Sequence, residues 1–131
     1  MKLNYIYTRL NVCDYQACKK FYRDVLGFEV AFADDDDEYT EFNTGNTRLS
    51  IFDRQKLREF VGPDEPMSYE RSYAGVALSF QVHNLDEAVA ELKHQGVTII
   101  SPPWNFPDRG FLSACFRDPD GNLIELQQLL T

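Results

Sequence analysis

Glu125 is the carboxylate in this sequence whose surroundings most resemble a chemical site. It lies between apolar neighbours in the stretch FRDPDGNLIELQQ, residues 116–128. The DPDG turn, in which glycine supplies a positive φ, and the alternation after it predict a strand following a tight hairpin turn. A carboxylate on such a strand could be a divalent metal ligand, a general acid or base, or an ordinary polar residue at the end of a sheet.

Arg9 is the second residue whose type and position suggest a functional role. It lies on a segment where Tyr7 and Arg9 alternate with apolar residues, so it would share one strand face with Tyr7. An arginine there would bind an anionic ligand group or neutralise a buried acid, and Glu125 is the candidate partner for a structural ion pair. Arg48 joins this set because it has the same strand parity as Ser50.

A proline-rich stretch, PPWNFPDRG at residues 102–110, carries two aromatic side chains, Trp104 and Phe106. Its composition predicts a loop. The aromatic side chains would either pin this loop to the core or form a lid that stacks on a flat or apolar ligand.

Several other catalytic patterns are missing from the sequence. There is no Ser/His/acid or Cys/His arrangement with a supporting motif, and no glycine-rich phosphate loop. The spacing of Cys13 and Cys18 does not fit zinc, and Cys115 lies beside an apolar residue, so the three cysteines are predicted to be reduced and mostly buried. The acidic run 34–38 lacks the spacing of a calcium loop and predicts a solvated, self-repelling hairpin tip.

Length and charge narrow the class of protein. A chain of 131 residues fits one domain, since domains usually have roughly 100–200 residues. The formal net charge of −8 disfavours nucleic acid as a partner and suits a cationic ligand. No stretch has the apolar length of a membrane span or a signal peptide, so a cytoplasmic protein with no membrane partner is expected.

Two segments of the chain, which begin at Tyr5 and at Tyr73, share the same order of predicted elements. Each has a strand, a polar turn, an amphipathic helix, a glycine and a second strand. Asp14 and Asn84 are the predicted helix N-caps, and Gly27 and Gly96 the predicted helix ends. Two further strands follow in each half. The sequence therefore predicts an α+β protein of two tandem βαβββ modules, at about residues 1–53 and 73–131. The polar connector, about 54–72, would begin with one helical turn.

The tandem modules, the helix end FYRDVLGFEV and the closing DPDGNLIEL resemble the vicinal oxygen chelate superfamily over nearly the whole chain. This superfamily includes glyoxalase I, the extradiol dioxygenases and the fosfomycin and bleomycin resistance proteins. The resemblance implies cupped mixed sheets with helices on the outer face. It also implies four metal-ligand positions, which fall here on Tyr7, Ser50, Gly75 and Glu125. Only Glu125 has metal-binding chemistry, so no metal and no other cofactor is expected.

The resulting hypothesis is a metal-free small-molecule-binding protein similar to the bleomycin resistance branch, acting as a homodimer with aromatic-lined cups. The ligand would be cationic or amphipathic. Its predicted contacts are Tyr7, Arg9, Arg48, Ser50, Phe52, Gly75, Ala77, Trp104, Phe106 and Glu125.

Two enzymatic alternatives stay open. One is a metal-dependent lyase, isomerase or dioxygenase. The other is a metal-free enzyme in which Glu125 is the general base and Arg9 or Tyr7 stabilises the developing charge. This second alternative requires a buried Glu125 with a raised pKa.

Overall fold

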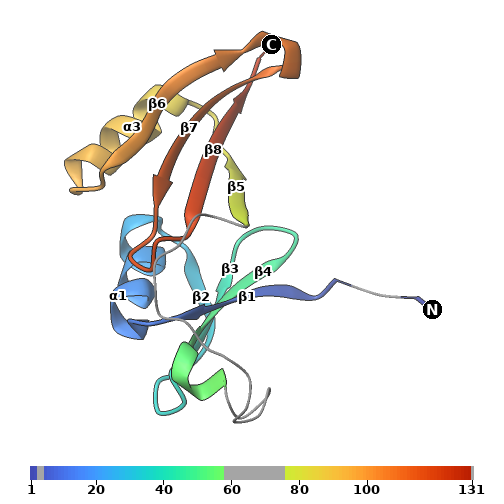
Figure 1. The fold of residues 1–131 in the computed structure, drawn as a ribbon, viewed down its shortest axis with the longest axis vertical. Helices are drawn as coiled ribbons and strands as arrows, with labels where there is room; N and C mark the ends of the chain where they lie inside the picture. Colours follow the sequence, from blue (N-terminus) through green and yellow to red (C-terminus); the bar gives the residue numbers. More distant parts are fainter. Residues whose placement is uncertain (3–4, 58–75, 131) are drawn as a thin grey trace. The chain divides into compact units, whose positions relative to one another are not determined.

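The computed structural model describes residues 1–2, 5–57 and 76–130 (Figure 1). The chain divides into two compact units, residues 1–70 and 71–131, and each unit is described by itself. Gly75, one of the predicted site residues, lies outside the described residues, as does most of the predicted connector.

The described part of unit 1 contains a four-stranded mixed sheet and, between its first two strands in sequence, a helical segment. In the sheet order β1-β4-β3-β2, β1 runs parallel to β4 and the other pairs are antiparallel. The helix α1 continues into one π-helical turn, and a 3-10 turn follows the last strand. The elements are β1 (Tyr7–Val12), α1 (Tyr15–Lys20), the π turn (Phe21–Val25), β2 (Glu29–Asp34), β3 (Tyr39–Asn43), β4 (Arg48–Asp53) and the 3-10 turn (Arg54–Leu57).

The local signals that predict the first helix act as expected. The Asp14 side chain accepts a hydrogen bond from the Ala17 amide at 3.0 Å, which satisfies one of the free amides of the first turn. Gly27, with φ of 76°, adopts the left-handed conformation that ends the helical segment. The helical turn predicted at the start of the connector is confirmed at Arg54–Leu57.

The core of unit 1 lies between α1 and one face of the sheet. Tyr15, Cys18 and Tyr22 from the helical segment are at most 1% exposed, and the Tyr22 ring packs on Phe42 with ring centroids 5.8 Å apart. The sheet supplies Val12, Phe42, Leu49 and Ile51. Each such buried side chain contributes about 1.5–3 kcal/mol, so this face is fully committed to stability and any ligand site must lie on the opposite face.

Unit 2 repeats this topology with the sheet order β5-β8-β7-β6, in which β5 runs parallel to β8. Asn84 caps the helix by accepting from the Glu87 amide at 3.1 Å, and the left-handed Gly96 follows its end. The elements are β5 (Ala77–Gln81), α3 (Leu85–His94), β6 (Ile99–Phe106), a 3-10 turn (Pro107–Arg109), β7 (Phe111–Arg117) and β8 (Leu123–Leu129). The prediction of an α+β fold with tandem βαβββ modules is confirmed.

The helix α3 covers one face of its sheet with Leu85, Val89 and Leu92. The sheet residues beneath it are Ala114, Phe116, Ile124 and Leu126, at most 6% exposed. Since side chains alternate along a strand, Glu125 must lie on the other face.

The predicted loop at residues 102–110 is wrong for most of its length, because Pro102–Phe106 belong to β6. Proline cannot donate a ladder hydrogen bond, but β6 is an edge strand, where only alternate amides need a partner. The pairing with β7 also shifts register between Ile99 and Ser101 and between Ser101 and Trp104. These bulges absorb the two prolines without ending the strand.

Candidate functional site

The face of the unit 1 sheet opposite α1 carries most of the residues predicted for that half. Strand pairing places Arg9 beside Ser50, Tyr7 beside Arg48, and Asn11 beside Phe52. Residues paired across neighbouring strands share one face, so these side chains form a continuous surface. We call this surface the unit 1 cup face.

A cavity of about 280 Å³ opens on the unit 1 cup face. Three of the predicted contacts line it, and four further lining residues escaped the sequence analysis. The lining residues are Tyr7, Arg9, Phe32, Asp34, Asp37, Tyr39 and Phe52. The cavity therefore combines four aromatic side chains, two carboxylates and one guanidinium.

A β-bulge explains why Phe32 and Asp34 were missed. Val30 pairs with Phe42, a core residue, so strict alternation along β2 would also turn Phe32 and Asp34 toward the core. The register shifts between Val30 and Phe32, and Phe32 then pairs with Glu41 on the cup face. The one extra residue thus rotates the end of β2 toward the cavity.

Arg9 and Tyr39 set the electrostatics of the cavity wall. The Arg9 guanidinium carbon lies 5.3 Å from the centroid of the Phe52 ring, a cation–π geometry. The Tyr39 hydroxyl donates to Glu41 Oε2 at 2.7 Å. Burial, together with this bond, raises the pKa of Tyr39 to about 12, so the phenol stays neutral. Tyr39 and Arg48 lower the pKa of Glu41 and hold it as an anion.

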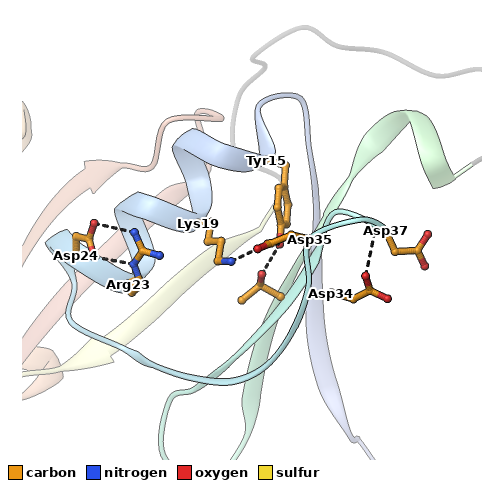
Figure 2. Close-up of polar contacts among 8 residues, drawn as sticks. Tyr15, Lys19, Arg23, Asp24, Asp34, Asp35 and Asp37 are labelled. Carbon is orange, nitrogen blue, oxygen red and sulfur yellow. Dashed lines mark hydrogen bonds and ion pairs between the residues drawn. The ribbon is translucent and has the colours of Figure 1, made fainter.

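The acidic run at the β2–β3 hairpin tip divides between two sides of the hairpin. Asp35 accepts hydrogen bonds from Lys19 Nζ at 2.7 Å and from the Tyr15 hydroxyl at 2.9 Å. Lys19 and Tyr15 lower the pKa of Asp35. Figure 2 shows Asp35 turned toward these two side chains, whereas Asp34 and Asp37 lie on the other side. The predicted exposed tip is confirmed, since the Asp35 side chain is 60% exposed, but Asp35 also anchors it to α1.

Asp34 and Asp37 are the two carboxylates of the tip that line the cavity. The Asp37 amide donates to Asp34 Oδ1 at 3.2 Å, which fixes the turn between them. Lys56 Nζ lies 3.8 Å from Asp37 Oδ1 and donates to the carbonyl of Asp36 at 2.9 Å. The Asp37 side chain remains 66% exposed, so it faces both the cavity and solvent.

Arg48 and Ser50 lie on the unit 1 cup face but are not among the lining residues of the cavity. Arg48 pairs with Glu41 at 2.9 Å at the exposed edge. Ser50 is completely buried, and its Oγ has no well-formed hydrogen bond within the described residues. Their role as ligand contacts stays a prediction.

In unit 2 the carboxylate of Glu125 is surrounded by hydrogen-bond donors. Ser79 Oγ and Ser113 Oγ each donate at 3.0 Å, and Gln127 Nε2 donates at 2.6 Å. Partial burial alone would raise the pKa of Glu125, but these three bonds outweigh it and the pKa lies below its ordinary value. A general base needs the opposite shift, so the structure disfavours Glu125 as the base.

Cys115 is the residue directly opposite Glu125 on β7. Burial first, and then the nearby Glu125 charge, raises the pKa of the Cys115 thiol. A raised pKa keeps the thiol protonated and poorly nucleophilic, as expected for a structural cysteine.

The remaining predicted contacts of unit 2 lie on the same face as Glu125. Trp104 pairs with Ser113, and Ala77 pairs with Leu123, two positions before Glu125. Trp104 is 66% exposed, so it does not pin a loop to the core of its unit. Phe106 is 38% exposed and packs on Phe111 with centroids 5.7 Å apart. Neither aromatic side chain fills the core of unit 2, and their role as ligand contacts stays a prediction.

The donor set at the four implied metal positions does not fit a divalent cation. Tyr7 is a phenol beside a guanidinium, Ser50 is a buried hydroxyl, and only Glu125 offers a carboxylate. Among residues 1–2, 5–57 and 76–130, no three His, Cys, Asp or Glu side chains converge on one point. A tight site normally needs three or more protein ligands, and these positions supply only one.

A family model, the Glyoxalase/Bleomycin resistance protein/Dioxygenase superfamily, matches residues 3–126. The chain therefore belongs to this superfamily. Among proteins, it is 32% identical over 122 residues to the uncharacterized protein YraH of Bacillus subtilis (strain 168), covering 93% of this chain and 95% of YraH. It is 30% identical over 125 residues to virulence protein STM3117 of Salmonella typhimurium, covering 91% and 79%.

Among solved structures, a glyoxalase/bleomycin resistance protein/dioxygenase from Nocardioides superposes with a TM-score of 0.80 at 22% identity, covering 99% of this chain and 85% of the other. This similarity supports the fold alone. In the part of the chain that the structure describes, no helix has the length and apolar character needed to cross a membrane.

Proposed function

We propose that this protein binds a small cationic or amphipathic molecule without a metal ion, in the manner of a sequestering protein similar to the bleomycin resistance branch. The observation that carries this proposal is the cavity on the unit 1 cup face. Aromatic walls bind an apolar or flat body, and carboxylates at the rim attract a positive group.

The charge distribution supports a positive ligand. The cavity has two carboxylates and one guanidinium, so its lining has a net charge of 1 − 2 = −1. The whole chain has a net charge of −8. A field of this sign raises the local concentration of cations and the rate at which they associate.

The four metal-ligand positions support the metal-free part of the proposal. Ser50 is a buried hydroxyl, Tyr7 is a phenol that lines the cavity with Arg9, and Gly75 has no side chain. Glu125 already accepts three hydrogen bonds from its own unit. A metal ion at Glu125 would have to displace these three hydrogen-bond donors, and it would obtain only one carboxylate ligand in return.

We also propose that two copies of the chain form a homodimer in the cytoplasm, with the cup faces contributing to the ligand sites. Exposed aromatic side chains on the Glu125 face, Trp104 at 66% and Phe106 at 38%, suit a surface that is covered on assembly. Sedimentation at several protein concentrations measures the oligomeric state.

The function is tested by thermal shift with cationic antibiotics, thiol conjugates and catechols, each with and without Ni²⁺, Mn²⁺ or Fe²⁺. We expect a cationic compound to raise the melting temperature and the metals to leave it unchanged, because only bound ligands stabilise the native state. A metal-dependent rise that Glu125→Ala abolishes would instead support the lyase, isomerase or dioxygenase alternative. Plasma mass spectrometry of protein purified without chelator provides the matching metal content.

A further inference from the structure

The lining of the unit 1 cavity combines aromatic rings with two carboxylates and one guanidinium. We propose that it binds the ammonium group of a small organic amine, with Asp34 and Asp37 as carboxylate partners and Arg9 as an internal cation that competes with the ligand. This inference rests on the proposed function and names the ligand class of the same site.

The carboxylates of the acidic tip, residues 34–38, lie on two sides of the hairpin. Asp35 is engaged by Lys19 and Tyr15 on the α1 side, and so it contributes to holding the hairpin. Asp34 and Asp37 lie on the other side of the hairpin (Figure 2), and both line the cavity. Two neighbouring carboxylates beside aromatic rings suit an ammonium ion, which gains both charge pairing and contact with the ring faces.

An inorganic divalent cation fits this cavity poorly. Such an ion needs about six oxygen ligands, and most of the lining side chains are aromatic. An organic cation is weakly hydrated on its apolar side, so aromatic walls can replace that part of its surroundings without a loss of coordination. The lining therefore favours an amine over a metal ion.

Arg9 already makes the contact that the ligand would make. Its guanidinium carbon lies 5.3 Å from the Phe52 centroid in the same cavity as Asp34 and Asp37. A second cation in the cavity is repelled by Arg9 while the two carboxylates attract it. Arg9 therefore lowers the affinity of the cavity for an amine. The same guanidinium would raise the affinity for an anionic ligand.

The size of the cavity limits the ligand. Sites for drug-sized molecules usually measure roughly 300–1,000 Å³, and this cavity has about 280 Å³. It suits a single-ring amine, or one amine-bearing arm of a larger molecule.

The test compares three probes of one shape and different charge: 2-phenylethylamine, 2-phenylethanol and 3-phenylpropionate. Each is titrated into the ¹⁵N-labelled full chain, and amide shifts are followed by NMR. We expect saturable shifts at the cavity strands with the amine, about tenfold weaker binding of the alcohol, and weakest binding of the propionate. Equal binding of amine and alcohol, or tightest binding of the propionate, would overturn the inference and leave the proposed function standing.

Three variants test which side chains determine the affinity for the amine. Asp34→Asn should weaken amine binding about fivefold, whereas Asp36→Asn, which removes the same charge from the same tip outside the cavity lining, should change it less than about twofold. Arg9→Gln should tighten amine binding about fivefold, because it removes the competing cation. A weaker amine affinity in Arg9→Gln contradicts the inference.

Amide spectra of each free variant verify that it is folded. The absence of saturable binding for all three probes, together with no response to the wider compound set, would overturn the proposed function and this inference with it.

Discussion

The two units share one topology but use the equivalent strand pair in opposite ways. In unit 1, Arg9 on the first strand lies beside Ser50 on the last strand. In unit 2, Ser79 on the first strand lies beside Glu125 on the last. Each pair thus joins one charged residue to one serine, with the charge on opposite strands and of opposite sign.

The surroundings of the two charges differ as well. Arg9 lies against Phe52 and lines a cavity together with the carboxylates of Asp34 and Asp37. Glu125 accepts bonds from Ser79, Ser113 and Gln127, and so its carboxylate is already satisfied by its own sheet. The comparison shows that equivalent positions in this fold do not carry equivalent chemistry, since neighbouring side chains decide whether a charge is available.

The largest expected effect tests whether the two units unfold together. Phe42 in unit 1 and Phe116 in unit 2 are both fully buried. Replacing either ring by alanine leaves a cavity, so Phe42→Ala and Phe116→Ala should each lower the free energy of unfolding by about 3–5 kcal/mol. Urea denaturation followed by circular dichroism measures this loss.

If the chain is one domain, as the length predicts, each variant lowers the stability of both units. Native-state hydrogen exchange resolves the two halves. Faster exchange confined to the unit that carries the substitution would show that the two units unfold separately. That result would contradict the prediction of a single domain.

The next largest effect tests the donors around Glu125. Glu125→Ala leaves the Ser79, Ser113 and Gln127 donors without their acceptor, which should cost about 1–3 kcal/mol in the free energy of unfolding at pH 7. In unit 1, Glu41→Ala is the matched change, because it leaves the Tyr39 hydroxyl and the half-exposed Arg48 without their acceptor. We expect a smaller loss there, since exposed ion pairs contribute little.

The loss from Glu125→Ala should depend on pH. The pKa of Glu125 is lowered in the folded protein, so its stabilising effect is present above the unfolded-state pKa of about 4.3 and disappears as the pH falls through the lower folded value. Urea denaturation at a series of pH values measures this difference. A difference between wild type and variant that stays constant down to pH 2 would contradict the role of the charged carboxylate.

The smallest effect tests a feature in which the units should behave alike. Gly27 and Gly96 follow the two helical segments with φ of 76° and 85°, and an added Cβ at either would meet no atom within 4 Å. Gly27→Ala and Gly96→Ala should therefore each cost about 1 kcal/mol through backbone strain alone. Thermal unfolding measures both; a much larger cost at one glycine would reveal a contact that differs between the units.

The local parts of the fold followed from the sequence. The caps Asp14 and Asn84 and the left-handed Gly27 and Gly96 depend on residues within one or two turns, and all four act as predicted. The alternation around Glu125 likewise placed it on the face away from α3, because strand periodicity depends only on neighbouring positions.

The site was less predictable. Tyr7, Arg9 and Phe52 lie where alternation places them, on the unit 1 cup face. Phe32 and Asp34 did not follow alternation, because the bulge after Val30 inverts the parity of β2. The edge strand through Pro102 and Pro103 was also missed, since composition alone favours a loop there.

The sequence by itself determined the superfamily, the two modules, the caps and the lack of metal-binding chemistry at Tyr7, Ser50 and Gly75. These properties depend on residue type and on contacts between near neighbours in the chain. Tertiary structure alone decided which carboxylates are available: Asp35 is engaged by α1, Asp34 and Asp37 line a cavity, and Glu125 is satisfied by Ser79, Ser113 and Gln127. Availability depends on pairing between strands far apart in sequence, and no local periodicity contains that information.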